Sequence, residues 1–200
     1  MGVVKLSTAG ILDYSKTSNF LSGNAPVSFG AFDLLETTTL TTTTAETVFT
    51  GLGSYSDYKH LQLRAVYRRD AFGYVGANLY MRLNADSANN YSRHELKGIE
   101  GTVYSSAQAP TSVAGYIQGP ASEVAAGAFG VAVIDILDAF STSKNKTVRI
   151  FSGVAGQDAA NSVISLSSGA WFSTSAITSL TLGAGTGNLA GTRFSLYGVK

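Results

Sequence analysis

From about residue 45 onward, the chain alternates apolar and polar residues over four to ten positions and then breaks at Gly, Asn, Asp or Ser. Successive side chains of a β-strand point to opposite faces, so this alternation is typical of strands with one buried face. In the segment 59–69, one face receives Leu61, Leu63, Ala65 and Tyr67, while polar side chains occupy the other. The pattern predicts an all-β fold.

The same pattern predicts about ten short strands. They are expected at 46–50, 59–69, 79–84, 91–99, 113–118, 128–137, 146–154, 162–168, 177–182 and 192–199. No segment after residue 45 shows the sustained period and caps of a helix. This number of strands is too large for an immunoglobulin-like domain, so we expect an antiparallel β-sandwich, jelly-roll-like, with an extended N-terminal arm. The pattern does not determine the strand order.

Three segments carry more specific expectations. The most apolar stretch, 129–137, suits a central strand that is covered on both faces. The polar run between Asn84 and Tyr91 suits a tight link between strands. The Gly-rich run 183–188 lacks the third Gly of a dinucleotide-binding loop, and we expect a hairpin turn there.

The first 35 residues lack any clean period, although they contain several large apolar side chains. A flexible leader is one interpretation, but solvated tails are depleted in such side chains. We therefore predict an arm at 1–35 that docks on another subunit and a β-sandwich domain at 36–200. The interaction residues expected in the arm are Leu6, Ile11, Leu12, Phe20 and Phe29. The Thr-rich run 37–47 fits either a linker or a first edge strand.

Charge and composition exclude several classes of function. Charged residues make up only 14% of the chain and the net charge is +1, so we expect no nucleic-acid partner, which would require a clustered basic surface. No apolar run is long enough for a transmembrane helix, and no secretion signal is visible, so no membrane partner is expected. The chain has no Cys, which excludes thiol nucleophiles and thiolate metal sites.

The residues that could support catalysis do not form a recognisable site. Neither a nucleophile elbow nor a phosphate-binding loop occurs. His60 and His94 are far apart, and Asp135 and Asp138 should lie on opposite faces of a strand. We expect Asp138 to start a turn, and Asp135 to need a partner such as an Arg because it lies in an apolar strand. The chain is therefore predicted not to be an enzyme and to need no cofactor.

Three further groups of residues are candidates for binding a metal, an acidic partner or a sugar. The oxygen-bearing residues Asn84, Asp86, Asn89 and Asn90 could bind calcium, but they lack the Gly and terminal Glu of a calcium loop, so no metal is expected. Arg64, Arg68, Arg69 and Arg82 could gather on one sheet surface to meet an acidic partner or a glycan, or form an ordinary solvated face. The aromatic residues that could stack on sugars, or instead pack in the core, are Tyr55, Tyr58, Tyr74, Tyr80, Tyr91, Tyr104, Trp171 and Phe172.

Eight segments together resemble a group of small virion structural proteins from tailed bacteriophages, including phages of cyanobacteria. They are Tyr58–Arg64, Met81–Asp86, Asn89–His94, Val133–Asp138, Lys144–Arg149, Ser168–Trp171, Ala176–Leu182 and Phe194–Lys200. The resemblance covers roughly residues 33–200. It implies a β-sandwich displayed on a virion and brings no catalytic residues with it.

From this resemblance we expect a non-enzymatic structural protein on the outer surface of the phage capsid. The expected role is a capsid decoration or cement protein that is anchored to the head by its N-terminal arm. Its expected partners are the major capsid protein and its own copies, in a homotrimer. The alternative is a tail or fibre component that recognises a host-surface glycan.

Overall fold

The computed structural model describes residues 31–70, 77–122, 124–125, 127–156 and 162–200. Within this part of the chain the regular structure is β, apart from a 3-10 turn at Leu52–Tyr55, so the all-β expectation is confirmed. The arm residues Leu6, Ile11, Leu12, Phe20 and Phe29 lie outside the described residues, and the arm stays a prediction.

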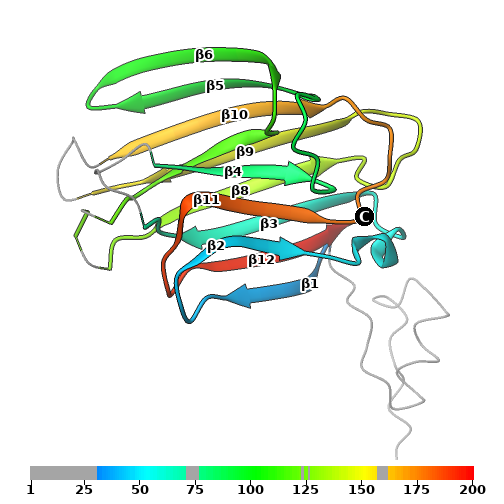
Figure 1. The fold of residues 1–200 in the computed structure, drawn as a ribbon, viewed down its shortest axis with the longest axis horizontal. Coiled ribbons are helices and arrows are strands. Elements are labelled where there is room, and N and C mark those ends of the chain that lie inside the picture. The colour runs from blue at the N-terminus through cyan, green and yellow to red at the C-terminus, as the bar shows by residue number, and fades with distance from the viewer. Residues whose placement is uncertain (1–30, 71–76, 123, 126, 157–161) are drawn as a thin grey trace, which may run out of the picture.

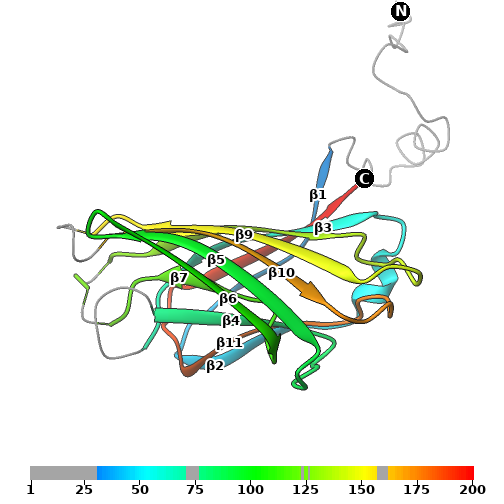
Figure 2. The ribbon, with the colours of Figure 1, turned by 90° about the horizontal axis from the view of Figure 1, so that it is seen from above.

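The described residues form twelve strands. Their bounds are β1 Phe32–Thr39, β2 Thr44–Phe49, β3 His60–Tyr67, β4 Ala77–Leu83, β5 Tyr91–Ile99, β6 Thr102–Thr111, β7 Gly115–Gly119, β8 Gly130–Leu137, β9 Lys146–Val154, β10 Val163–Trp171, β11 Leu180–Asn188 and β12 Arg193–Val199. All neighbouring strands are antiparallel. They form one sheet of eight strands and one of four, which pack face to face as a sandwich (Figures 1 and 2).

Eight of the strands have the connectivity of a jelly roll. The order β1-β12-β3-β8 in the large sheet faces β2-β11-β4-β7 in the small one. From β1 to β4, successive strands alternate between the large and the small sheet. The chain also passes from the small sheet to the large one between β7 and β8 and between β11 and β12. This connectivity pairs the first strands with the last ones, β1 with β12 and β2 with β11, as in two interleaved Greek keys. The jelly-roll expectation is therefore confirmed by the strand order.

The other four strands enlarge one sheet only. The β5-β6 hairpin follows β4, the β9-β10 hairpin follows β8, and together they extend the large sheet in the order β8-β9-β10-β5-β6. The last strand of the small sheet, β7, packs over β9 and β10. The hairpin β5-β6 therefore projects beyond the small sheet, at the margin opposite β1 (Figure 1).

The core lies between the two sheets. The expected inward face of β3 is confirmed, since Leu61, Leu63, Ala65 and Tyr67 are all buried. From the small sheet, β4 contributes Leu79, Met81 and Leu83, as their alternation predicted. Each such side chain contributes roughly 1.5 to 3 kcal/mol when fully buried.

Two buried cations hold irregular segments against the sandwich. The Arg68 guanidinium, just after β3, donates hydrogen bonds to the carbonyls of Ser122, Val124, Ala125 and Ala128. These four residues belong to the connection between β7 and β8, so Arg68 replaces the regular hydrogen bonds that this segment lacks.

Lys146, at the start of β9, is fully buried in the same manner. Its Nζ donates to the carbonyls of Ser141, Lys144 and Thr174. Burial lowers the pKa of this ammonium group from its ordinary value. Backbone carbonyls accept its hydrogen bonds in place of water.

Several expectations about strands were wrong. The stretch 129–137 is not covered on both faces, because the outward side of β8 is exposed, with Val131 59% accessible to solvent. The run 183–188 is not a hairpin turn but the second half of β11, where the pairing with β2 is irregular. The strand β6 was not expected at all. In addition, β1 begins at Phe32, so the sheet includes the last residues that were assigned to the arm.

No helix in the described part of the chain has the length and apolar character required to cross a membrane.

Candidate functional site

The outward face of the large sheet carries a group of exposed apolar side chains, which we call the outer patch. Its members are Leu96, Val103, Val131, Val133, Phe151, Ile164 and Leu166, from β5, β6, β8, β9 and β10. Val133 is 39% exposed and Val103 is 71% exposed, and the other five lie between these values.

Strand register places these residues side by side. Val133 lies opposite Phe151, which lies opposite Leu166, which in turn lies opposite Leu96. Directly opposed residues of antiparallel strands point to the same face of the sheet, so these four form one row across β8, β9, β10 and β5.

A second row runs parallel to the first and contains two glycines. Val131 lies opposite Gly153, Gly153 opposite Ile164, Ile164 opposite Gly98, and Gly98 opposite Val103. A glycine has no side chain to fill the sheet surface, so the row alternates between apolar side chains and bare backbone. A hollow of about 780 Å³ results, lined by all five of these residues.

An adjoining hollow of about 490 Å³ lies at the β10-β5 end of the first row. It is lined by Leu96 and Leu166 and extends to His94, Arg149 and Ser105. The outer patch therefore continues into a more polar region at the next row of the sheet.

Charged groups border the outer patch but do not belong to it. Asp135 accepts hydrogen bonds from Gln62 (2.8 Å) and from the Arg149 guanidinium (2.8 Å). Burial alone would raise the pKa of Asp135, but these bonds together lower it below its ordinary value. Arg149 is therefore an arginine partner of Asp135. This confirms the prediction that the Asp135 carboxylate needs a partner.

On the other side of Val133, Arg64 lies directly opposite on β3. Its guanidinium carbon stacks 4.4 Å from the ring centroid of Tyr197 and 5.2 Å from that of Phe32. Both charged borders are therefore held by partners on the sheet, and the outer patch between them is neutral.

The outer patch is large for the surface of a monomeric protein. Seven side chains, most of them about half exposed, add up to an apolar area on the order of 600 Å², the upper end of what monomeric proteins leave in water. Larger patches usually mark a surface that contacts a protein, a ligand or a membrane. The arrangement offers apolar contact area and shape, without a charged or nucleophilic group at its centre.

The two histidines are not brought together. His60 begins β3 and His94 lies in β5, with β8, β9 and β10 between these strands, a separation of roughly 19 Å at ordinary strand spacing. His60 accepts a hydrogen bond from the backbone N–H of Asp138 through Nδ1. Asp138 starts the turn after β8, as expected, with a left-handed φ of 48°.

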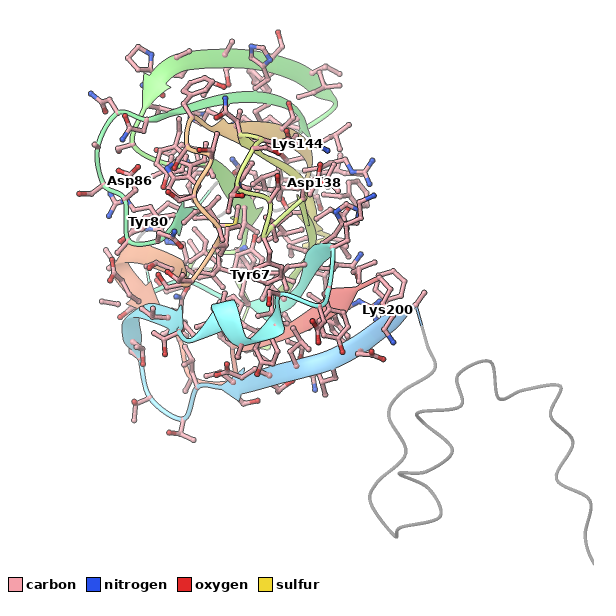
Figure 3. The ribbon with its side chains drawn as sticks, turned by 90° about the vertical axis from the view of Figure 1, so that its right-hand side faces the viewer. Tyr67, Tyr80, Asp86, Asp138, Lys144 and Lys200 are labelled. Atoms are coloured by element: carbon pink, nitrogen blue, oxygen red, sulfur yellow. The ribbon has the colours of Figure 1, made fainter. Side chains whose placement is uncertain are left out.

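The Asp138 carboxylate lies beside Lys144 within this turn (Figure 3), at 2.9 Å from its Nζ. The hydrogen bond from Lys144 lowers the pKa of Asp138. His60, Asp138 and Lys144 thus form a contact that closes the connection between β8 and β9.

Two of the residues considered for calcium, Asp86 and Asn84, use their side-chain oxygens in the protein's own hydrogen bonds. Asp86 accepts from Asn90, from the backbone of Ala88 and from the Trp171 indole. Asn84 accepts from the backbone of Thr178. The run between Asn84 and Tyr91 links β4 to β5, as predicted, and it joins the small sheet to the large one.

Across the described ranges, no group of three or more His, Asp or Glu side chains is placed to hold a metal ion.

The four arginines do not gather on one surface. Arg64 lies on the outward face of the large sheet, whereas Arg82 stacks on Tyr80 in β4 of the small sheet, with 4.6 Å to the ring centroid. Arg68 is buried, and the backbone of Arg69 forms an isolated antiparallel β-bridge with Asn188 of β11. Of the two alternatives for these arginines, the shared surface is therefore not formed.

The candidate aromatic platforms are also divided. Trp171 and Tyr91 are buried and stack on each other, with ring centroids 6.3 Å apart. Phe172 and Tyr104 are about half exposed. Tyr74 lies outside the described residues. The two buried rings have no face available to a sugar.

The outer patch is not among the residues predicted from the sequence, although a signal for it is present. In 130–137, apolar residues occupy both the odd and the even positions, which indicates a strand with two apolar faces. The pattern was interpreted as cover on both sides. Only the tertiary structure shows that the four-stranded sheet covers one side.

Comparisons with protein-family models, with curated proteins and with solved structures found no match for this chain.

Proposed function

We propose that this chain is a non-enzymatic structural protein of a tailed-phage virion, a capsid decoration or cement protein anchored to the head through its N-terminal arm. Its partners in this proposal are the major capsid protein and other copies of the chain. The proposal has two sources, the resemblance of residues 33–200 to virion structural proteins and the outer patch.

The outer patch is the observation that supports an assembly protein best. A neutral apolar surface on the order of 600 Å² is costly to leave in water, and permanent assemblies bury such surfaces against neighbouring subunits. An enzyme of similar size would need convergent polar groups in a hollow. The larger hollow of the outward face, by contrast, is lined mainly by Val, Ile, Phe, Ala and Gly.

The fold supports the proposal only in a general way. Jelly rolls occur in viral capsid proteins, but also in lectins and in enzymes, so the fold alone does not imply a function. The proposal therefore rests on the resemblance and on the outer patch.

The experiment compares three purified forms for binding to phage heads that lack the protein. They are the full chain, a form without residues 1–30, and a full-length form with Leu6, Ile11, Leu12, Phe20 and Phe29 changed to Ser. The core strands begin at Phe32, so all three should fold. We expect only the full chain to sediment with the heads.

Equal binding by all three forms would exclude the arm as the anchor. Binding of the full chain to tails but not to heads would replace the decoration role with the tail or fibre alternative. Binding to neither would contradict the proposal as a whole.

A further inference from the structure

The strand β6 is an outermost strand that nothing in the described structure covers. It is ten residues long, and nine of them are exposed. It lies at the free margin of the large sheet (Figure 1) and pairs only with β5. Its outer backbone N–H and C=O groups can therefore pair with another strand.

The four outermost strands differ in how they are protected. β1 carries Asp33 and Glu36, and β2 carries Glu46. β7 is only five residues long and mostly buried. β6 is long and exposed, and it has no charged residue between Thr102 and Thr111. Since proteins usually shorten, cover or charge their edge strands to prevent pairing, β6 is the one edge left open to it.

We propose that β6 pairs antiparallel with β6 of a second copy of this chain, about a two-fold axis perpendicular to the sheet. Two sheets of eight strands would then become one continuous sheet. The inference deepens the proposed function, and rests on it for the biological role, because it specifies one contact between copies. The contact itself can be tested without virions.

The composition of β6 favours a second copy over an unrelated strand. In a two-fold pair every residue faces a residue of the same segment, and opposed like charges would destabilise the pair. An uncharged strand avoids this repulsion in every register. Pro110 has no N–H to donate, so we expect pairing to extend from Thr102 to Ala109.

The position of β6 leaves room for the partner. β5 and β6 project beyond the small sheet, so a second copy can approach without displacing any strand. Val103, in the outer patch, and Tyr104, on the opposite face, are 71% and 49% exposed. Pairing would shield both and would bring the outer patches of the two copies onto one surface.

Cysteine cross-linking tests the register, because the natural chain has no Cys. A perpendicular two-fold axis places one residue of β6 opposite its own copy, with Cα atoms about 4.5 to 5.5 Å apart, within disulfide range. The single variants are Ser105→Cys, Ser106→Cys and Ala107→Cys, all at exposed positions. Thr39→Cys, exposed at the opposite edge on β1, is the matched control.

We expect mild oxidation to convert at least one β6 variant to a covalent dimer at ten times or more the yield of Thr39→Cys. Yields equal to that of the control for all three variants would overturn the proposal.

A charge at the same positions tests the contact without cross-linking. The full chain should have the mass of a dimer in sedimentation equilibrium. Ser105→Lys and Ser106→Lys should raise the dissociation constant at least tenfold, whereas Thr39→Lys should leave it unchanged. The emission of Trp171, which should be the same in all forms, reports that each variant is folded.

Two results would overturn the pairing. One is a full chain that stays monomeric at every concentration. The other is an oligomer, including the trimer expected from the resemblance, whose mass the β6 lysines leave unchanged. Failure of the arm to bind heads would contradict the proposed function but would not alter these masses, so the two failures can be distinguished.

Discussion

The indole N–H of Trp171 donates a hydrogen bond of 2.7 Å to Oδ2 of Asp86. Asp86 lies in the link that carries the chain from β4 in the small sheet to β5 in the large one, and Figure 3 shows it at this end of the sandwich. Trp171 ends β10, the neighbour of β5. The contact therefore fixes the link between the sheets to the strand beside it.

This contact predicts a loss of stability in acid. Burial acts to raise the pKa of Asp86, but the hydrogen bonds from Asn90, Trp171 and Ala88 together lower it below the ordinary value of 3.8. A carboxyl whose pKa is lower in the folded than in the unfolded state stabilises the fold above the unfolded pKa. This contribution is lost as the pH falls below about 3.8 and through the folded pKa.

We expect Asp86→Ala to lower the free energy of unfolding at pH 7 by about 2 kcal/mol, because hydrogen bonds to a charged group contribute about 1.5 to 3 kcal/mol. The variant should also lose less stability than the natural chain between pH 5 and pH 3. Urea unfolding followed by the emission of Trp171, the single Trp of the chain, measures both effects. The exposed Asp57, changed to Ala, is the control. An unchanged acid dependence in Asp86→Ala would contradict this account.

Arg68→Met should destabilise the protein by about 3 kcal/mol or more. The substitution keeps an apolar stem but leaves the carbonyls of four residues in the β7-β8 connection without their donor, and an unpaired buried acceptor costs about 1 to 3 kcal/mol. Arg193→Met, at an exposed position of β12, should change stability by no more than about 0.5 kcal/mol. Thermal unfolding of the two variants compares these values, and equal melting temperatures would show that Arg68 has no structural role.

Gly169→Ala should prevent stable folding, whereas Gly185→Ala should be tolerated. A Cβ at Gly169, in β10, would overlap the backbone carbonyl oxygen of Ala114. Because this is a backbone atom, it cannot move away without shifting the chain around it. A Cβ at Gly185 would meet nothing within 4 Å. We expect a cost of about 3 kcal/mol or more for the first and less than about 1 kcal/mol for the second. Soluble yield and circular dichroism measure the difference, and a stable Gly169→Ala protein would show that β10 and Ala114 are further apart.

Substitution by Ser should cost much more stability at one of two neighbouring residues of β9 than at the other. Ile150 is fully buried, and Ile150→Ser should cost about 3 kcal/mol or more, as large-to-small core substitutions do. Phe151 is 53% exposed in the outer patch, and Phe151→Ser should cost no more than about 1 kcal/mol. The second variant should also bind less of a hydrophobic dye such as anilinonaphthalene sulfonate. Unchanged dye binding would mean that the outer patch is not the apolar surface that the dye detects.

Local alternation in the sequence predicts those features of this protein that do not depend on which strands pair. Leu61, Leu63 and Ala65 identified the buried face of β3 because side chains alternate across any strand, whatever it pairs with. The need of Asp135 for a partner followed from the cost of an unpaired carboxylate in an apolar strand. The number of strands was enough to favour a jelly roll over an immunoglobulin-like domain.

The tertiary structure decided what depends on neighbours far along the chain. The alternation does not say which strands pair, so only the observed order shows that β5-β6 and β9-β10 extend one sheet beyond the other. The extension of the large sheet beyond the small one explains why β6 was not predicted. Neither face of β6 is buried, so its sequence does not need to alternate apolar and polar residues. The turn before β6 contains Gly101, and the structure shows positive φ at both Glu100 and Gly101, as type I′ hairpin turns require.

The same extension of the large sheet decided the candidate site. Val131 and Val133 are apolar whether or not a second sheet covers them. The sequence does not show where the covering sheet ends. Only the position of β7 over β9 and β10 shows that the small sheet lies on one side of β8 and leaves the other side exposed. Whether an apolar strand is core or interaction surface is therefore a property of the packed layers, because burial depends on what lies across the sheet and not on the residue itself.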